Sequence, residues 1–240
     1  MRRVLLLSNS TLHGSGYLDH AAAEIQDFLG RDVRRVLFVP YAMHDRDAYA
    51  RQTRARFSAM GYALDSAHEA SRPAEAAAGA EAIFVGGGNT FRLLDSLHRL
   101  GLLPVIRQRV ALGVPYVGSS AGSNVACPTL KTTKDMPIVE PRSFEALGLV
   151  EFQISPHFLD PDPASTHMGE TQEERIVQYL EENDRPVAGL REGAMLRVEE
   201  NTVLLKGSGM RAFRRGHQPV ETRPVADVGD LLRHPTAGAP

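Results

Sequence analysis

The sequence contains no tryptophan and only one cysteine, Cys127, among its 240 residues. A single thiol cannot form an intramolecular disulfide, and this composition is typical of a reducing compartment, so we expect a cytoplasmic location. No run of about 18 apolar residues occurs, and the apolar run Val4–Leu7 near the start is too short for the core of a signal peptide. We therefore expect no membrane segment and no membrane partner.

Neither sign of charge dominates, because 27 Lys and Arg residues against 29 Asp and Glu residues give a net charge of −2. This near-balance provides no general attraction to nucleic acid. Metal-binding patterns are also missing, since there is no cysteine pair, no His-Glu-x-x-His and no EF-hand loop. We predict no metal site, no cofactor and no nucleic-acid partner, and the sequence indicates no particular oligomeric state.

Short apolar runs alternate with segments of helical period along most of the chain. This alternation predicts an α/β fold with a mostly parallel sheet and helices on both faces. The last two strands are close enough in sequence to pair antiparallel at the sheet edge. We expect one α/β domain over residues 1–216 and a loose, proline-rich tail over residues 217–240. The predicted strands cover residues 4–7, 36–39, 62–67, 83–85, 114–117, 152–155, 187–190, 194–198 and 203–206, and the main predicted helices cover residues 46–60, 89–100, 105–112 and 170–182.

The strongest local motif is Gly118-Ser119-Ser120-Ala121-Gly122, a G-x-S-x-G that directly follows a predicted strand. In a nucleophile elbow this spacing holds the central serine in a tight turn with its hydroxyl exposed at the end of the strand. Ser120 has the central position, whereas Ser119 and Ser123 are its neighbours. An ordinary strand-to-helix turn rich in small residues is the simpler alternative.

A second glycine-rich turn, Gly86-Gly87-Gly88-Asn89-Thr90, also lies between a predicted strand and a predicted helix. Its bare backbone suits a phosphate cradle or an oxyanion donor, and Asn89 or Thr90 could equally cap the helix. The turn lacks the third glycine of the dinucleotide fingerprint, and no Gly-Lys dipeptide for a P-loop occurs in the chain.

A serine nucleophile needs a base, and His157 is the best-placed of the nine histidines because it follows the predicted strand 152–155. His13 and His167 are weaker candidates. The acid that would orient the histidine has three candidates, Asp135, Asp160 and Glu192, and their spacing does not choose among them.

Taken together, these segments resemble peptidase E, the α-aspartyl dipeptidase family of serine peptidases. The resemblance runs in order along almost the whole chain up to about residue 216. Its matching segments are Ser8-Asn9-Ser10, Pro40-Tyr41-Ala42, 86–91, 118–124, 132–139, 155–160, 166–171 and Arg191-Glu192-Gly193.

The resemblance implies a flavodoxin-like sheet related to class I glutamine amidotransferases, and hydrolysis of dipeptides with a free N-terminal aspartate. It implies Ser120 as nucleophile and His157 as base, with two family positions for the acid, Asp135 and Glu192. The amidotransferase-like geometry favours Glu192 directly beyond the histidine. The resemblance also implies oxyanion donation by the N–H groups of Gly88 and Ala121. An aspartyl carboxylate would need a cation, for which Arg175, Lys134 and Arg142 are our candidates, and we expect Asn89 to bind substrate as well.

Two other functions stay open on the sequence. An esterase of the α/β-hydrolase type would use Ser120, Asp135 and His157 in that order, although the chain is poor in the aromatic residues that line acyl pockets. A non-catalytic ligand-binding module on the same fold would not need the serine and the histidine. The partner we expect is a small dipeptide substrate.

Overall fold

The structure, a computed structural model, describes residues 2–164, 166 and 168–234. Its largest element is an eight-stranded sheet in the order β12-β9-β8-β1-β5-β4-β2-β3. The strands of this sheet are β1 (Arg3–Leu7), β2 (Arg35–Val39), β3 (Ala63–Ser66), β4 (Ala82–Val85), β5 (Tyr116–Ser119), β8 (Ala194–Glu199), β9 (Thr202–Gly207) and β12 (Ala226–Asp227).

The sheet is mixed, which corrects the expectation of a mostly parallel one. The five strands β1, β5, β4, β2 and β3 are parallel to one another, whereas β8, β9 and β12 add antiparallel pairs beyond β1. The short turn between β8 and β9 forces those two strands to run in opposite directions, because parallel neighbours need a long crossover.

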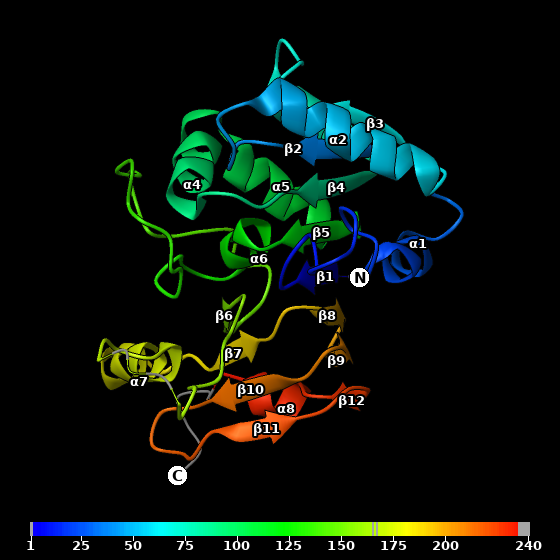
Figure 1. The fold of residues 1–240 in the computed structure, drawn as a ribbon. Coiled ribbons are helices and arrows are strands. Elements are labelled where there is room, and N and C mark those ends of the chain that lie inside the picture. Colours follow the sequence, from blue (N-terminus) through cyan, green and yellow to red (C-terminus); the bar gives the residue numbers. More distant parts are fainter. Residues whose placement is uncertain (1, 165, 167, 235–240) are drawn as a thin grey trace.

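A second sheet of four strands, which the sequence analysis did not predict as a separate sheet, has the order β11-β10-β7-β6. Only β6 and β7 are parallel in it. Figure 1 shows this sheet beside the antiparallel part of the larger one. Its strands are β6 (Gln153–Ser155), β7 (Val187–Leu190), β10 (Met210–Phe213) and β11 (Val220–Thr222).

Helices cover both faces of the parallel strands, as predicted (Figure 1). One core packs α1 and α2 against Leu5, Phe38 and Phe84, and the opposite core packs α3 to α6 against residues such as Leu6 and Val85. Alternate residues of each strand thus point into different cores, which is why the strands are apolar throughout. The helices are α1 (Ala22–Leu29), α2 (Arg46–Ala59), α3 (Pro73–Ala78), α4 (Thr90–Arg99), α5 (Leu102–Ala111), α6 (Ala121–Ala126), α7 (Gln172–Glu182) and α8 (Gly229–Leu232).

The segment after residue 216 was expected to be a loose tail, and through residue 234 it is not. Its strand β11 pairs with β10 and its strand β12 pairs with β9. Val228 and Leu232, at the start and the end of α8, are each 1% exposed and join the main core, so apolar burial holds this segment in place. Residues 235–240 of the expected tail lie outside the described residues.

The topology gathers several turns at one edge of the sheets. The parallel strands β1, β4 and β5 end at Leu7, Val85 and Ser119, so the turns after them meet at their common carboxyl edge. Strands β6 and β7, also parallel, end at Ser155 and Leu190 on the adjoining sheet. None of the helices in the described ranges combines the length and apolarity needed to cross a bilayer.

Candidate active site

Ser120 occupies the turn between β5 and α6, in a backbone conformation that residues other than glycine adopt rarely. Its φ is 51° and its ψ is −107°, and its N–H donates to the carbonyl of Leu7 at 3.0 Å. The turn needs its flanking glycines, because a Cβ on Gly118 would lie 2.6 Å from the carbonyl oxygen of Gly122. Ser123 anchors the turn from behind, since its hydroxyl donates to the carbonyls of Leu7 and Gly118.

His157 follows β6 and reaches Ser120 across the gap between the two sheets. The distance between Oγ of Ser120 and Nε2 of His157 is 3.0 Å, which is hydrogen-bonding distance. His157 also has a positive φ, 52°, so the turn after β6 is as unusual as the elbow. This geometry lets the imidazole take a proton from the serine hydroxyl.

Glu192 lies on the far side of the imidazole, in the turn after β7. Its Oε1 is 2.9 Å from Nδ1 of His157, so serine, histidine and glutamate form one hydrogen-bonded line. The His157 and Glu192 side chains are 40% and 47% exposed. This line therefore opens to solvent, where a small substrate can reach it.

The other two acid candidates have different partners. Asp135 accepts hydrogen bonds from the backbone N–H and the hydroxyl of Thr90, at 2.7 and 2.6 Å, at the first turn of α4. Asp160 instead forms a two-pronged ion pair with Arg191. Neither carboxylate is hydrogen-bonded to His157, so the interpretation of Asp135 as its direct partner, as in the esterase order, does not fit the geometry.

Gly88 and Ala121 belong to the two turns that meet at the elbow, the turn after β4 and the turn after β5. Gly88 has a φ of 131°, and a Cβ there would be 2.7 Å from the carbonyl oxygen of Ala42. The neighbouring Gly87 packs directly on the elbow, since a Cβ on it would lie 3.2 Å from Cβ of Ser120. Among the described residues, nothing accepts a hydrogen bond from the N–H groups of Gly88 and Ala121. Two free donors at this place suit an oxyanion.

Asn89 has a structural role in this structure. Its Oδ1 caps α4 by accepting from the N–H of Arg92, and its Nδ2 donates to the carbonyl of Met136. The side chain thus ties the irregular segment after residue 127 to the glycine-rich turn 86–90. It is partly exposed on that turn, where a substrate amine or carboxylate could also meet it.

Two of the three predicted cations line one small cavity beside the histidine. Lys134 and Arg175 both line this cavity, of about 80 Å³, together with Ser155 and Gln172. Lys134 donates from Nζ to the carbonyl of His157 at 2.8 Å. Burial lowers the pKa of Lys134 to about 8, although the nearby carboxylates of Asp135 and Glu192 oppose this shift.

Besides lining this cavity, Arg175 faces Glu170 at 3.6 Å. Among the remaining candidates, Arg142 is exposed. His13 is exposed in the first loop and makes no hydrogen bond to Ser120. His167, the other alternative base, lies outside the described residues. Cys127 is fully buried, and burial raises the pKa of its thiol to about 12, so it remains a neutral core residue.

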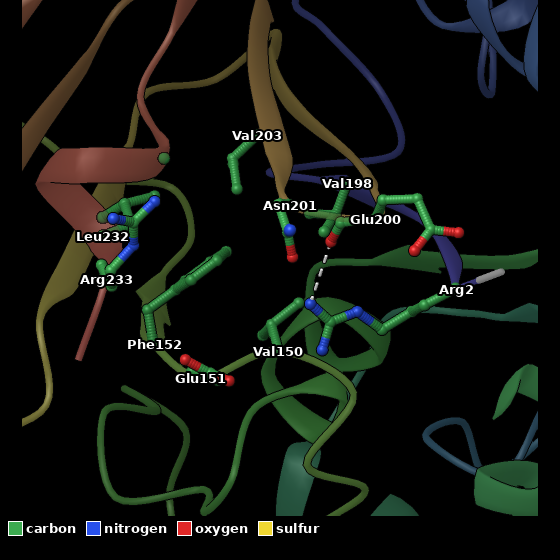
Figure 2. A pocket seen from close by; sticks show the side chains of 11 residues that line it. Arg2, Val150, Glu151, Phe152, Val198, Glu200, Asn201, Val203, Leu232 and Arg233 are labelled. Atoms are coloured by element: carbon green, nitrogen blue, oxygen red, sulfur yellow. Dashed lines mark hydrogen bonds between the residues drawn. The ribbon is translucent and has the colours of Figure 1, made fainter. Parts of the chain in front are cut away.

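A separate cavity of about 250 Å³ lies at the opposite end of β1, between the β8–β9 turn and α8 (Figure 2). Arg2 and Arg233 line it together with Glu151 and Glu200, and none of the predicted site residues does. The charges of these four residues balance, so the cavity has no net preference for an anion or a cation. Across the described ranges, no group of His, Cys, Asp and Glu side chains is arranged to hold a metal ion.

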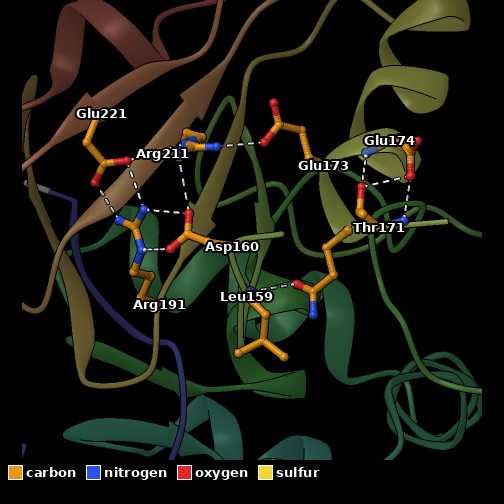
Figure 3. A network of polar contacts seen from close by, with 9 residues as sticks. Leu159, Asp160, Thr171, Glu173, Glu174, Arg191, Arg211 and Glu221 are labelled. Atoms are coloured by element: carbon orange, nitrogen blue, oxygen red, sulfur yellow. Dashed lines mark hydrogen bonds and ion pairs between the residues drawn. The ribbon is translucent and has the colours of Figure 1, made fainter. Parts of the chain in front are cut away.

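Three residues near the site had no role predicted from the sequence. Ser8 and Asn9 directly follow β1, and Arg191 directly precedes Glu192. Figure 3 shows Arg191 between Asp160 and Glu221, to which it is hydrogen-bonded. Their position just after strand ends at the carboxyl edge was the signal that could have pointed to them.

Comparison with known proteins shows the family of this chain. The model of Peptidase family S51 matches residues 4–206, and the chain therefore belongs to Peptidase family S51. A protein of Streptomyces coelicolor named Peptidase E is 53% identical over 230 residues, which cover 95% of this chain and 94% of that protein. A Drosophila melanogaster protein named "Probable alpha-aspartyl dipeptidase" is 46% identical over 235 residues, covering 97% and 98%.

A solved structure shares the fold at much lower sequence identity. The crystal structure of a peptidase from an acI-B1 Actinobacterium superposes with a TM-score of 0.71 at 17% identity, covering 95% of this chain and 96% of that one. The elbow, the histidine and the glutamate described above all lie inside the range that the family model matches.

Proposed function

We propose that this protein is a serine dipeptidase that hydrolyses dipeptides with a free N-terminal aspartate. The observation that carries the proposal is the line from Oγ of Ser120 through the imidazole of His157 to the carboxylate of Glu192, with steps of 3.0 and 2.9 Å. Membership of Peptidase family S51 and the names of the two relatives support the same reaction class and the same substrate class.

In this mechanism Oγ of Ser120 attacks the carbonyl carbon of the aspartyl residue while Nε2 of His157 takes the hydroxyl proton. The N–H groups of Gly88 and Ala121 donate to the oxyanion, and Glu192 stabilises the imidazolium. The C–N bond then breaks, and the imidazolium gives its proton to the leaving amine. Water, deprotonated by His157, hydrolyses the aspartyl ester and restores Ser120.

Charge supports an acidic substrate. Lys134 and Arg175 line the cavity beside His157, and a carboxylate side chain there would gain charge-assisted hydrogen bonds from them. Asp135 and Glu192 lie near Lys134 and could receive the α-ammonium group of the substrate. We propose Asn89 as a further contact, because its turn borders the same space.

The remaining parts of the proposal concern the fold and the location. We propose a kinship with the flavodoxin-like sheets of class I glutamine amidotransferases, on the basis of the five parallel strands and the elbow at their carboxyl edge. The buried, single Cys127 supports a reducing, cytoplasmic location. We also propose a single domain that continues past the expected boundary at residue 216, because β11, β12 and α8 pack onto the rest of the chain.

A substrate screen tests the function. Purified protein is assayed with Asp-Leu, Glu-Leu, Asn-Leu, acetyl-Asp-Leu and a short-chain ester. We expect turnover of Asp-Leu and at least about 10²-fold lower kcat/KM for acetyl-Asp-Leu, because acetylation removes the positive charge that the two carboxylates would pair with. Ester hydrolysis without Asp-Leu hydrolysis would favour the esterase. Absence of any turnover, together with no labelling of Ser120 by a fluorophosphonate, would favour a binding module.

A further inference from the structure

The first contact beyond the catalytic line comes from Ser8, the residue directly after β1. Its side chain is completely buried. Its hydroxyl accepts from the backbone N–H of His157 at 2.8 Å and donates to the carbonyl of Leu190, the last residue of β7, at 2.9 Å. One hydroxyl thus joins the turn that carries His157 to the strand that leads into Glu192.

Asn9 makes the corresponding contact to the turn of the acid. It is 1% exposed, and its Oδ1 accepts from the N–H of Gly193 at 2.8 Å. Its Nδ2 donates to the carbonyl of Thr11, which fixes the orientation of the amide. Gly193 has a φ of 81°, so the turn directly after Glu192 has a conformation that favours glycine.

These contacts matter because both turns are otherwise open to solvent. His157 and Glu192 are each more than one-third exposed, and His157 has a backbone conformation that is unfavourable for a side chain with a Cβ. Arg191, next to Glu192, is fixed by Asp160 and Glu221 (Figure 3). In the described ranges, three side chains hydrogen-bond to the backbone of His157 or Gly193: Lys134 donates to the carbonyl of His157, and Ser8 and Asn9, both almost completely buried, accept from the N–H groups of His157 and Gly193.

We propose that Ser8 and Asn9 are positioning residues that set the distance between His157 and Glu192. Ser8 holds the turn of His157 through the backbone N–H of His157, and Asn9 holds the turn of Glu192 through the N–H of Gly193. Because Ser8 and Asn9 are consecutive residues after β1, they fix the positions of the two turns relative to each other. The inference rests on the proposed function, because it assumes that the Ser120–His157–Glu192 line performs the chemistry. A displacement of about 1 Å in such a line can lower turnover about 10²-fold.

Matched pairs of variants separate the hydrogen bonds from the packing. Ser8→Thr and Ser8→Val have nearly the same shape, and only the first keeps a hydroxyl. Asn9→Leu keeps the shape of the side chain and removes both hydrogen bonds. Ser66→Val is the control, because Ser66 is also buried and hydrogen-bonded but lies at the end of β3, on the far edge of the sheet.

The expected result is a loss of about 10²-fold in kcat on Asp-Leu for Ser8→Val and Asn9→Leu, with KM nearly unchanged. We expect Ser8→Thr to recover most of the activity and Ser66→Val to keep it. In a Glu192→Gln background, Asn9→Leu should cause little further loss, because a residue that acts through Glu192 has nothing left to position. Thermal unfolding establishes that each variant is folded.

Labelling of Ser120 by a fluorophosphonate distinguishes failure of the proposed function from failure of the positioning role of Ser8 and Asn9. If the wild-type protein is neither labelled nor active, the proposed function fails, and the inference fails with it. If the wild type is labelled and Ser8→Val and Asn9→Leu are labelled at the same rate, the inference alone is overturned. Full additivity of Asn9→Leu and Glu192→Gln would also overturn it. If Ser8→Val fails to fold, the double-mutant cycle of Asn9→Leu and Glu192→Gln tests the positioning role by itself.

Discussion

The carboxylate of Glu192 lies 2.9 Å from Nδ1 of His157, whereas the carboxylate of Asp135 is taken up by the backbone N–H and hydroxyl of Thr90. The two acids that the family resemblance left open therefore have different surroundings. One is hydrogen-bonded to the imidazole of His157, and the other joins the segment after residue 127 to the first turn of α4.

This difference predicts unequal effects of removing the two charges. We expect Glu192→Gln to lower kcat about 10⁴-fold, because the amide keeps the size of the side chain but no longer stabilises the imidazolium. Asp135→Asn should act mainly on KM and on stability, since it weakens two hydrogen bonds at the end of a helix. Steady-state kinetics and thermal unfolding of both variants test this. A collapse of kcat in Asp135→Asn with a mild effect of Glu192→Gln would reverse the assignment.

The nucleophile is tested by serine substitutions within the elbow. We expect Ser120→Ala to fold normally and to lose about 10⁶-fold in kcat, because no other hydroxyl hydrogen-bonds to the imidazole of His157 in the described part of the chain. Ser119→Ala is the matched control, since the Ser119 hydroxyl is buried and has no hydrogen-bond partner among the described residues. Retained activity in Ser120→Ala would contradict the mechanism.

The glycine-rich turn 86–90, which we propose to supply an oxyanion donor, gives a third prediction. Gly88→Ala should lower kcat about 10²- to 10³-fold, because a Cβ at this positive φ would meet the carbonyl of Ala42 and move the N–H donor away from the serine. Gly79→Ala serves as its control, since Gly79 has a negative φ and a Cβ added there would lie an ordinary 3.8 Å from its nearest neighbouring atom. Equal kcat values for Gly88→Ala and the wild type would show that this turn supplies no oxyanion donor.

The depressed pKa of Lys134 predicts a pH dependence. Burial favours the neutral amine, so the side chain is charged below pH 8 and loses its proton as the pH rises through about 8. We expect KM for Asp-Leu to rise above that pH in the wild type and less so in Lys134→Arg, because a guanidinium stays charged. Comparing the two proteins on one substrate cancels the titration of the substrate amine. If KM rises equally with pH in the wild type and in Lys134→Arg, Lys134 does not bind the aspartyl carboxylate.

Local patterns in the sequence were sufficient for the parts of this protein that depend on near neighbours along the chain. The predicted strand 187–190 is β7 with the same bounds, and the glycines around Ser120 do form a strand-to-helix turn. Strand β5 starts two residues later than predicted, at Tyr116, because pairing of Tyr116 with Val4 sets its register. Such shifts arise because hydrophobic periodicity marks an element and long-range pairing sets its ends.

Long-range packing decided the rest. The choice among Asp135, Asp160 and Glu192 depends on the paths of turns that are more than twenty residues apart in sequence, which spacing alone does not encode. The segment after residue 216 is held in place because Val228 and Leu232 are buried against a core that other segments form. The same holds for Ser8 and Asn9, which read as two ordinary polar residues after a strand. Only the folded chain brings them to the backbones of His157 and Gly193, because a hydrogen bond depends on distance in space and the sequence records only distance along the chain.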